Sequence, residues 1–263
     1  MALPLTTGIA AAAGSLAFIR QAYIFSLSYG LSMLGIGAAV LMAAPAGNLL
    51  KLHALLVAAY GLRLFLFLFW RQSFQPGYDG AARLRKLDKT PRLKRIPIIL
   101  STALFYSLMS APLVFHLQSA PFGGAAAAIS AGGSALAAVG LAVETIADQQ
   151  KSLFKMKLRA EEKPDELYMG GLYAVSRHAN YLGEIVFWLG SFVAGLPSLA
   201  AAGVPLLGRG LRLISSSLGL AGIVFIMLSA TKRLEARQAE KHRPSAWFDK
   251  YYLSSGALLP KLL

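Results

Sequence analysis

The chain has 263 residues, of which 56% are hydrophobic and only 14% are charged. A soluble domain carries about a quarter of its residues as charged side chains, so this composition excludes an ordinary soluble protein and indicates an integral membrane protein. The absence of cysteine excludes disulfides and thiolate metal sites. The formal net charge is +14. Because the composition is that of a membrane protein, this charge predicts basic loops that face anionic lipid, rather than nucleic-acid binding.

The first 22 residues form an apolar segment that runs from Leu3 to Ile19. This segment lacks the basic start of a signal peptide, and further apolar stretches follow it. We expect either a short membrane span or a targeting stretch, and the sequence leaves both readings open. Residues 23–263 contain no internal repeat and no long linker, so they predict a single transmembrane domain.

Six apolar stretches after this segment are long enough to be membrane spans, since about 18 to 20 such residues cross the hydrocarbon core. Glycine, alanine and serine recur in several of them, for example across Gly30–Gly37 and Gly123–Gly140. Small residues allow membrane helices to approach closely, so the pattern predicts an all-α, multi-pass helix bundle. The expected spans lie at about residues 23–44, 52–70, 96–117, 122–147, 181–203 and 210–230.

Basic residues gather in three regions: the 71–95 loop, the 148–178 connection and the tail after Ala230. Two expected spans separate each region from the next, so all three lie on one side of the membrane. The positive-inside rule predicts that this side is cytoplasmic. The composition does not identify the membrane, and the endoplasmic reticulum, a plastid and the bacterial inner membrane remain open.

Three polar constellations fall on that predicted cytoplasmic side. In the first, Glu144 and Asp148 are four residues apart, which places both carboxylates on one face of a helix. A solvated helix end, with Asp148 paired to a nearby lysine, explains Asp148 equally well. It does not explain Glu144, which lies inside an apolar stretch, because a carboxylate is costly to bury there.

The second constellation is the segment GGLYAVSRHANYLGEIVF, in which a dense polar cluster runs directly into an apolar span. Donors at a helix N-terminus favour anions, so this cluster predicts binding of phosphate or carboxylate groups. In the alternative interpretation, Arg177 and Tyr181 only anchor the helix end at the membrane interface. This interpretation does not explain Glu184. The candidate binding residues here are Arg177, His178, Asn180, Tyr181 and Glu184.

The third constellation is the basic and aromatic tail, with Arg233, Glu235 and Tyr251 as candidates. Such tails commonly rest on the membrane surface, so its signal is weaker. Arg63 lies within an expected span, and we expect it to face the bundle interior, with Glu144 as one candidate partner. The four histidines, at positions 53, 116, 178 and 242, are scattered and show no metal-ligand spacing. GxGxxG, P-loop, GxSxG and HExxH motifs are absent.

In order along the chain, these residues read E-x-x-x-D-x-Q-K at 144–151, G-L-Y-x-x-S-R-H-x-N-Y-x-G-E at 171–184, R-x-E at 233–235 and paired tyrosines at 251–252. The arrangement resembles the steroid 5-alpha-reductase C-terminal domain superfamily, and in particular its uncharacterised steroid reductase-like membrane proteins. Isoprenylcysteine carboxyl methyltransferases and sterol C14 reductases are similar in the same region. The resemblance covers about residues 60–263 and is most specific at 171–184.

The resemblance implies a bundle of six or seven membrane helices with a cytoplasm-facing cofactor cavity, and makes 144–263 the cofactor-binding half. The implied activity is an oxidoreductase that transfers hydride from NADPH to a C=C bond of a sterol-like or isoprenoid lipid. A proton donor is also needed, and Glu144, Tyr106 and Tyr60 are the candidates. The implied cofactor-binding residues are Asp148, Arg177, His178, Asn180, Tyr181, Glu184, Arg233, Glu235 and Tyr251.

Two departures from the family pattern leave alternatives open. Ala179 stands where many members have proline, which removes a device for starting a helix but no ligand. The tail has the single Glu235 rather than the paired acids of the methyltransferases, which argues modestly against S-adenosylmethionine. The alternatives are an S-adenosylmethionine-dependent lipid or prenyl methyltransferase and a non-catalytic lipid-binding membrane subunit.

Overall fold

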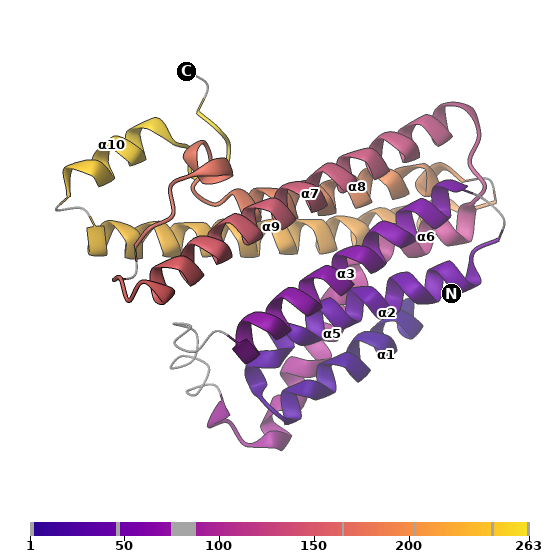
Figure 1. Cartoon of the computed structure of the whole chain (residues 1–263). Coiled ribbons are helices and arrows are strands. Elements are labelled where there is room, and N and C mark those ends of the chain that lie inside the picture. Colours follow the sequence, from indigo (N-terminus) through magenta and orange to yellow (C-terminus); the bar gives the residue numbers. More distant parts are fainter. Residues whose placement is uncertain are drawn as a thin grey trace. The chain divides into compact units, whose positions relative to one another are not determined.

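The structure is a computed structural model, and it describes residues 3–45, 48–74, 88–164, 166–201, 203–242 and 245–261. These residues fold into α-helices joined by loops and short 3-10 helices (Figure 1), which confirms the all-helical class. The α-helices are α1 (Leu3–Gly14), α2 (Leu27–Ala43), α3 (Asn48–Phe74), α5 (Ile96–Met109), α6 (Ala111–Ser119), α7 (Gly124–Ala160), α8 (Ala179–Gly195), α9 (Leu206–His242) and α10 (Ala246–Ser254). The 3-10 helices are η1 (Ser15–Phe18), η2 (Gln21–Phe25), η3 (Arg92–Arg95), η4 (Gly171–Ala174) and η5 (Leu196–Ala200).

Within the described residues, four helical segments are long and apolar enough to cross a membrane: Leu49–Phe74, Gly124–Ala160, Ala179–Leu199 and Leu206–His242. The segments Arg92–Met109 and Ala111–Ser119 meet at a bend of 47° and make a fifth span if they are counted together. Pro112 follows this bend, and because proline has no N–H it cannot continue the hydrogen bonding of α5. These spans support an integral membrane protein.

The predicted count of six or seven spans is not confirmed. The stretch near residues 23–44 forms η2 and the 17-residue helix α2, and the first segment forms the 12-residue helix α1. At 1.5 Å per residue, α2 is about 26 Å long, which is less than the roughly 30 Å of a hydrocarbon core. Both helices are apolar, but they are shorter than an ordinary span.

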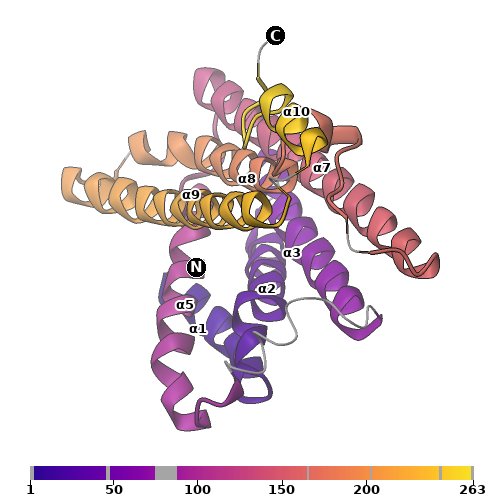
Figure 2. The ribbon, with the colours of Figure 1, turned by 90° about the vertical axis from the view of Figure 1, so that its left-hand side faces the viewer.

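The chain divides into two compact units. Unit 1 comprises Met1–Ala135 and Leu189–Ala221, and unit 2 comprises Leu136–Trp188 and Gly222–Leu263. In unit 1, α1 packs against α2 and α5, and α2 packs along α3 (Figure 2).

Glycines set the distance between α2 and α3. A Cβ atom on Gly61 would lie 2.2 Å from the backbone nitrogen of Leu34, and one on Gly37 would lie 2.6 Å from that of Ala58. Neither backbone can yield to such contacts, so only glycine fits at these positions. The small residues noted in the sequence therefore bring these two helices into close contact.

Unit 2 contains a second close pair, formed by α7 and α8. A Cβ atom on Gly140 would lie 2.3 Å from the nitrogen of Phe187, and one on Gly183 would lie 2.5 Å from the nitrogen of Glu144. The partner numbers fall along one helix as they rise along the other, so the two helices are antiparallel. This register places the carboxylate-bearing end of α7 beside the start of α8.

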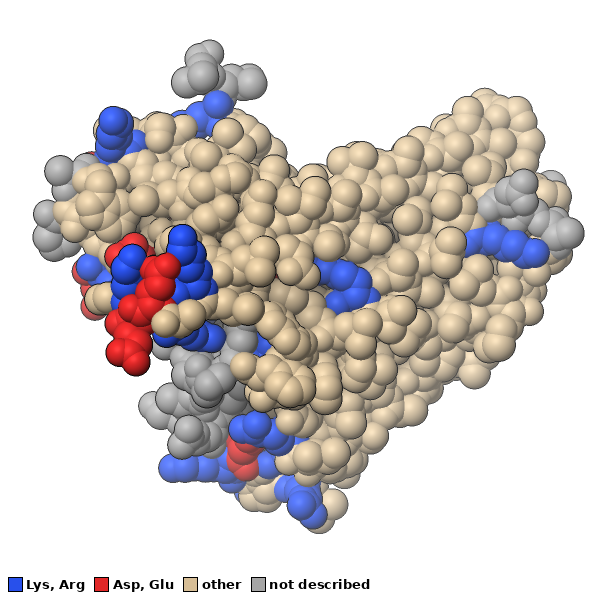
Figure 3. All heavy atoms as spheres, viewed as in Figure 1, with Lys and Arg blue, Asp and Glu red and all other residues tan. Residues whose placement is uncertain are grey.

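Large apolar side chains cover the outer faces of the long helices. On α9, Leu211, Leu218 and Phe225 are all more than half exposed and recur every seven residues. This spacing keeps them on one side of the helix. Most of the surface visible in Figure 3 carries no Lys, Arg, Asp or Glu. Such a surface is stable in contact with lipid and would be unfavourable in water.

Candidate functional site

The polar segment before α8 is shaped by a turn that requires glycine. Gly171 has a positive φ of 55°, and a Cβ atom there would lie 2.3 Å from Oε1 of Gln150. The same Oε1 accepts a hydrogen bond of 3.0 Å from the backbone N–H of Leu172. Gln150 of α7 therefore holds η4 in place, and the turn delivers Arg177 and His178 to the start of α8.

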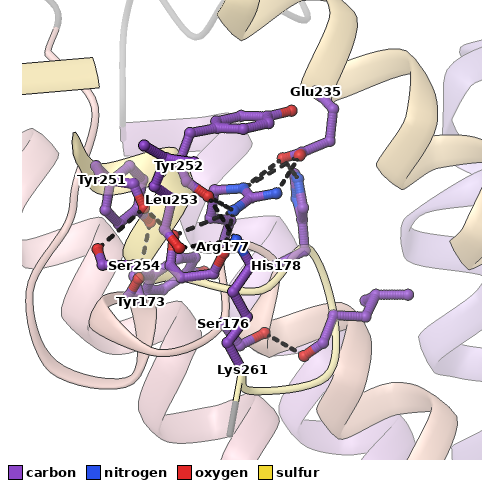
Figure 4. Close-up of polar contacts among 12 residues, drawn as sticks. Tyr173, Ser176, Arg177, His178, Glu235, Tyr251, Tyr252, Leu253, Ser254 and Lys261 are labelled. Atoms are coloured by element: carbon purple, nitrogen blue, oxygen red, sulfur yellow. Dashed lines mark hydrogen bonds and ion pairs between the residues drawn. The ribbon is translucent and has the colours of Figure 1, made fainter. Parts of the chain in front are cut away.

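The carboxylate of Glu235 on α9 binds both of these residues (Figure 4). Arg177 donates from Nη2 to Oε2 at 2.7 Å and from Nε to both carboxylate oxygens at 3.1 Å. Nε2 of His178 lies 2.8 Å from Oε1. The side chains of Arg177 and Glu235 are only 6% and 13% exposed, so this is a buried ion pair.

The rest of the Arg177 guanidinium is also engaged. Nη1 donates to the backbone carbonyls of Tyr252 and Ser255, and lies 3.2 Å from the hydroxyl of Ser255. The ring of Tyr252 covers the guanidinium, with its centroid 3.8 Å from Cζ. Arg177 therefore joins α9 to the end of α10 and to Ser255 directly after it, and a ligand phosphate would have to replace one of these partners.

Backbone hydrogen bonds extend this connection into what we call the C-terminal clasp, the pairing of residues 173–178 with residues 251–258. The N–H groups of Arg177 and His178 donate to the carbonyls of Gly256 and Ala257 at 2.9 and 3.1 Å. Gly256 donates in return to Val175 at 3.1 Å, and Ser176 Oγ donates to the carbonyl of Leu258 at 2.6 Å. Two N–H groups that could bind an anion before α8 are thus occupied by protein carbonyls.

Tyr173 is one residue of this site that the sequence analysis did not select as a candidate. Its hydroxyl donates to Oδ1 of Asn180 at 3.3 Å, and its backbone carbonyl accepts a hydrogen bond of 2.7 Å from the hydroxyl of Tyr251. Nζ of Lys151 lies 5.5 Å from the centre of its ring. Its place in the G-L-Y triplet was the available signal, but a lone tyrosine beside a glycine turn gave no reason to separate it from its neighbours.

Burial dominates the electrostatics of these tyrosines. It raises the pKa of Tyr173 above its ordinary value, and the negative charge of Asp148 adds to the effect. Burial also raises the pKa of Tyr251 to about 12. The pKa of Tyr252 rises to about 12 as well, first because of burial and then because its hydroxyl lies against the Glu235 carboxylate. All three hydroxyls therefore stay protonated at neutral pH and act as donors.

The three predicted carboxylates of α7 and α8 are all buried: Glu144 is 3% exposed, and Asp148 and Glu184 are each 8% exposed. Glu144 abuts Gly183 across the α7–α8 pair, and Glu184 is the next residue along α8. Tyr181 stacks on the ring of His178 at 5.6 Å. Unit 2 therefore brings together predicted residues from α7, α8, α9 and α10.

Three of the predicted residues lie elsewhere. Arg233 is exposed on α9, and its position two residues before Glu235 puts it on a different face of that helix. Tyr60 and Tyr106 belong to unit 1, where the Tyr60 hydroxyl donates to that of Tyr29 at 3.0 Å and the Tyr106 hydroxyl donates to the carbonyl of Ile24 at 2.7 Å.

Arg63, the arginine expected to face the bundle interior, lies on α3. Its Cζ is 5.5 Å from the ring centre of Phe67, one turn further along the same helix. Its pairing with Glu144 stays a prediction.

In a comparison with known protein families, the family described as "Protein of unknown function (DUF1295)" matches residues 25–254. No curated protein and no solved structure matches the chain significantly. Because the family match covers most of the chain, the protein belongs to the DUF1295 family.

Proposed function

We propose that this protein is a membrane-embedded oxidoreductase that uses NADPH to reduce a C=C bond of a hydrophobic lipid of the sterol or isoprenoid class. The observation that carries the proposal is the convergence of the motif segments in unit 2. These segments are distant in sequence, and contacts join Lys151 to Tyr173, Tyr251 to Tyr173, and both Glu235 and Tyr252 to Arg177. Their order along the chain is the order that resembles the steroid 5-alpha-reductase C-terminal domain superfamily.

The contacts divide these residues into two roles. Arg177, His178 and Glu235 satisfy one another and hold the start of α8 in place. Asp148, Asn180 and Glu184 supply acceptors that suit ribose hydroxyls and a carboxamide, and Lys151 beside Tyr173 supplies a positive charge. These groups fit a nicotinamide nucleotide, whose bound form would supply the hydride.

The proton that accompanies hydride transfer needs a donor. Glu144 is the candidate in the same unit as the cofactor residues, because it is buried on α7 against Gly183. Tyr60 and Tyr106 remain candidates in unit 1, where both hydroxyls donate to neighbouring oxygens. The basic loops and tail would face the cytoplasm, which is where NADPH is available.

The same site also suits a second ligand. Three buried carboxylates, from Glu144, Asp148 and Glu184, lie on α7 and α8, and carboxylates are groups that can bind the sulfonium and ammonium groups of S-adenosylmethionine. This observation favours a lipid or prenyl methyltransferase as the second candidate. Glu235, the single acidic residue of the tail motif, argues against a methyltransferase, because it is already bound by Arg177 and His178.

Ligand titration of the full chain in detergent tests these functions. We expect saturable NADPH binding that weakens at least tenfold in Asp148→Asn and in Asn180→Ala. Asp249→Asn is the matched control, because Asp249 is exposed on α10 and its loss should leave the affinity unchanged. Binding of S-adenosylmethionine alone would select methyl transfer. Binding of neither ligand would refute both proposed enzymes and would make the non-catalytic lipid-binding protein the leading alternative.

A further inference from the structure

Unit 1 contains a hydrogen-bonded chain of three side chains that the proposed function does not use. Nε2 of His53 lies 2.8 Å from Oγ of Ser191, and Nδ1 of His53 lies 3.2 Å from Nδ1 of His116. The three residues come from α3, α8 and α6, and at most 1% of any of them is exposed. The sequence shows these histidines as scattered, since 63 positions separate them.

The short distance between the two Nδ1 atoms means that one ring donates a proton and the other accepts it. The remaining nitrogen of His53 then has only one role open to it at Ser191. If His53 donates to His116, it accepts from the serine hydroxyl; if it accepts from His116, it donates to the serine oxygen. The chain thus has two complete arrangements, which differ only in the positions of the protons.

The described part of unit 1 contains one carboxylate, that of Asp88, which accepts hydrogen bonds from Arg20 and from the backbone of Gln21. It is therefore not available to stabilise a charged imidazolium at His53 or His116. The charged groups on neighbouring elements are cations. Lys51 is exposed shortly before His53 on α3, and Arg212 lies over the ring of Phe115 at 5.2 Å. Both rings are therefore best accommodated in their neutral forms.

Ser191 also differs from the nucleophile of a hydrolytic triad. It lies inside α8, where backbone N–H groups donate to carbonyls one turn earlier and are not available for an oxyanion. A serine, a histidine and a second histidine in a row can still pass a proton, because each group is both a donor and an acceptor.

We propose that Ser191, His53 and His116 form a proton relay within the membrane part of the protein. In one transfer, the serine hydroxyl gives its proton to His53 Nε2, and His53 Nδ1 gives its proton to His116 Nδ1. Nε2 of His116 releases a proton to a water molecule, and the serine oxygen takes up another proton from a protonated water molecule at the other end of the chain. One proton enters and one leaves, so neither ring carries a net charge before or after the transfer.

Nuclear magnetic resonance of the full chain, labelled with ¹⁵N in the histidine rings, tests the relay. The four histidines are assigned by single His→Asn substitutions. A relay predicts that the ring nitrogens of His53 and His116 give shifts averaged between their protonated and unprotonated values. Fixed, separate shifts for both rings would show a static hydrogen bond between helices and would overturn the proposal.

His116→Asn separates the relay from a structural role. The amide can still bond to His53, but its donor and acceptor are different atoms, so it cannot pass a proton on. We expect His53 to lose its averaged signal and settle into one tautomer, with thermal stability close to that of the wild type. Persistent averaging of His53 in this variant would refute the relay. If His116→Asn does not fold, Ser191→Ala provides the same comparison from the other end, and His242→Asn is the control.

Discussion

Glu235 Oε2 lies 2.7 Å from Nη2 of Arg177, and both side chains are almost fully buried. This pair joins the middle of the polar motif to a helix residue 58 positions further along the chain, so it could not be read from spacing. In the structure it is the central connection of the candidate site, and it determines which other groups are available to a ligand.

Breaking this ion pair should destabilise unit 2 strongly. Glu235→Gln leaves the Arg177 charge buried without its counter-ion, and such losses cost about 3–5 kcal/mol. Thermal unfolding in detergent measures the effect. Glu240→Gln is the control, because Glu240 is exposed on the same helix. The double variant Arg177→Met with Glu235→Leu should lose less than the sum of the single variants; additive losses would show that the two side chains are not coupled.

Gly183→Ala should separate α7 from α8. The new methyl group would lie 2.5 Å from the backbone nitrogen of Glu144, and the backbone cannot move aside locally. Overpacking of this kind costs about 1–3 kcal/mol. Gly132→Ala is the control, because a methyl group there would have nothing within 4 Å and alanine favours a helix. Equal thermal stability of the two variants would contradict the close contact between α7 and α8.

Alkaline pH should weaken the C-terminal clasp through Tyr251. Burial raises the pKa of this tyrosine from 10.0 to about 12, so the unfolded chain loses the proton more easily than the folded chain. Stability is therefore unaffected below pH 10, and it falls as the pH rises from 10 towards 12. In Tyr251→Phe this fall should be shallower, and stability at neutral pH should drop by about 1 kcal/mol because the Tyr173 carbonyl loses its donor. An unchanged alkaline slope in denaturant titrations would count against the burial of this hydroxyl.

Tyr173→Phe should weaken cofactor binding without unfolding the protein. The hydroxyl of Tyr173 orients the side-chain amide of Asn180, and a hydrogen bond of this kind contributes about 0.5–1.5 kcal/mol. On the proposed function, the affinity for NADPH should fall by about threefold to tenfold. Tyr168→Phe is the control, because it keeps the ring that packs against Tyr173. An NADPH affinity equal to that of the wild type would show that the hydrogen bond from Tyr173 to Asn180 does not contribute to cofactor binding.

The sequence predicted the all-helical class of the fold, and it marked the polar cluster before α8, because both depend on local patterns. Apolar length marked α3, α7, α8 and α9, and the motif at 171–184 marked the start of α8. The apolar composition of the first two helices also favours spans, but composition does not show where a helix ends. The 3-10 helix η2 takes up the first residues of the expected 23–44 span, so α2 begins only at Leu27, and α1 changes to the 3-10 helix η1 after Gly14.

The partners of the marked residues could not be predicted, because they depend on packing between distant segments. The sequence around Arg177 is typical of a residue that binds an anionic ligand, yet its guanidinium is held by Glu235 and by carbonyls of the tail. His53 and His116 are unrelated by spacing, yet their rings are hydrogen-bonded. Sequence spacing reports neighbours on one helix, whereas these contacts join different helices.

The C-terminal clasp makes two distant segments open and close together. Ser176 and Leu258 are 82 positions apart, and the hydrogen bond between them lies beside those that Arg177, His178 and Gly256 make across the same two segments. Their amide hydrogens should therefore exchange with solvent at similar rates, as one cooperative unit. We therefore expect that loss of the docked tail also removes the contacts that hold the start of α8, so that ligand occupancy of the candidate site would depend on how often the tail is docked.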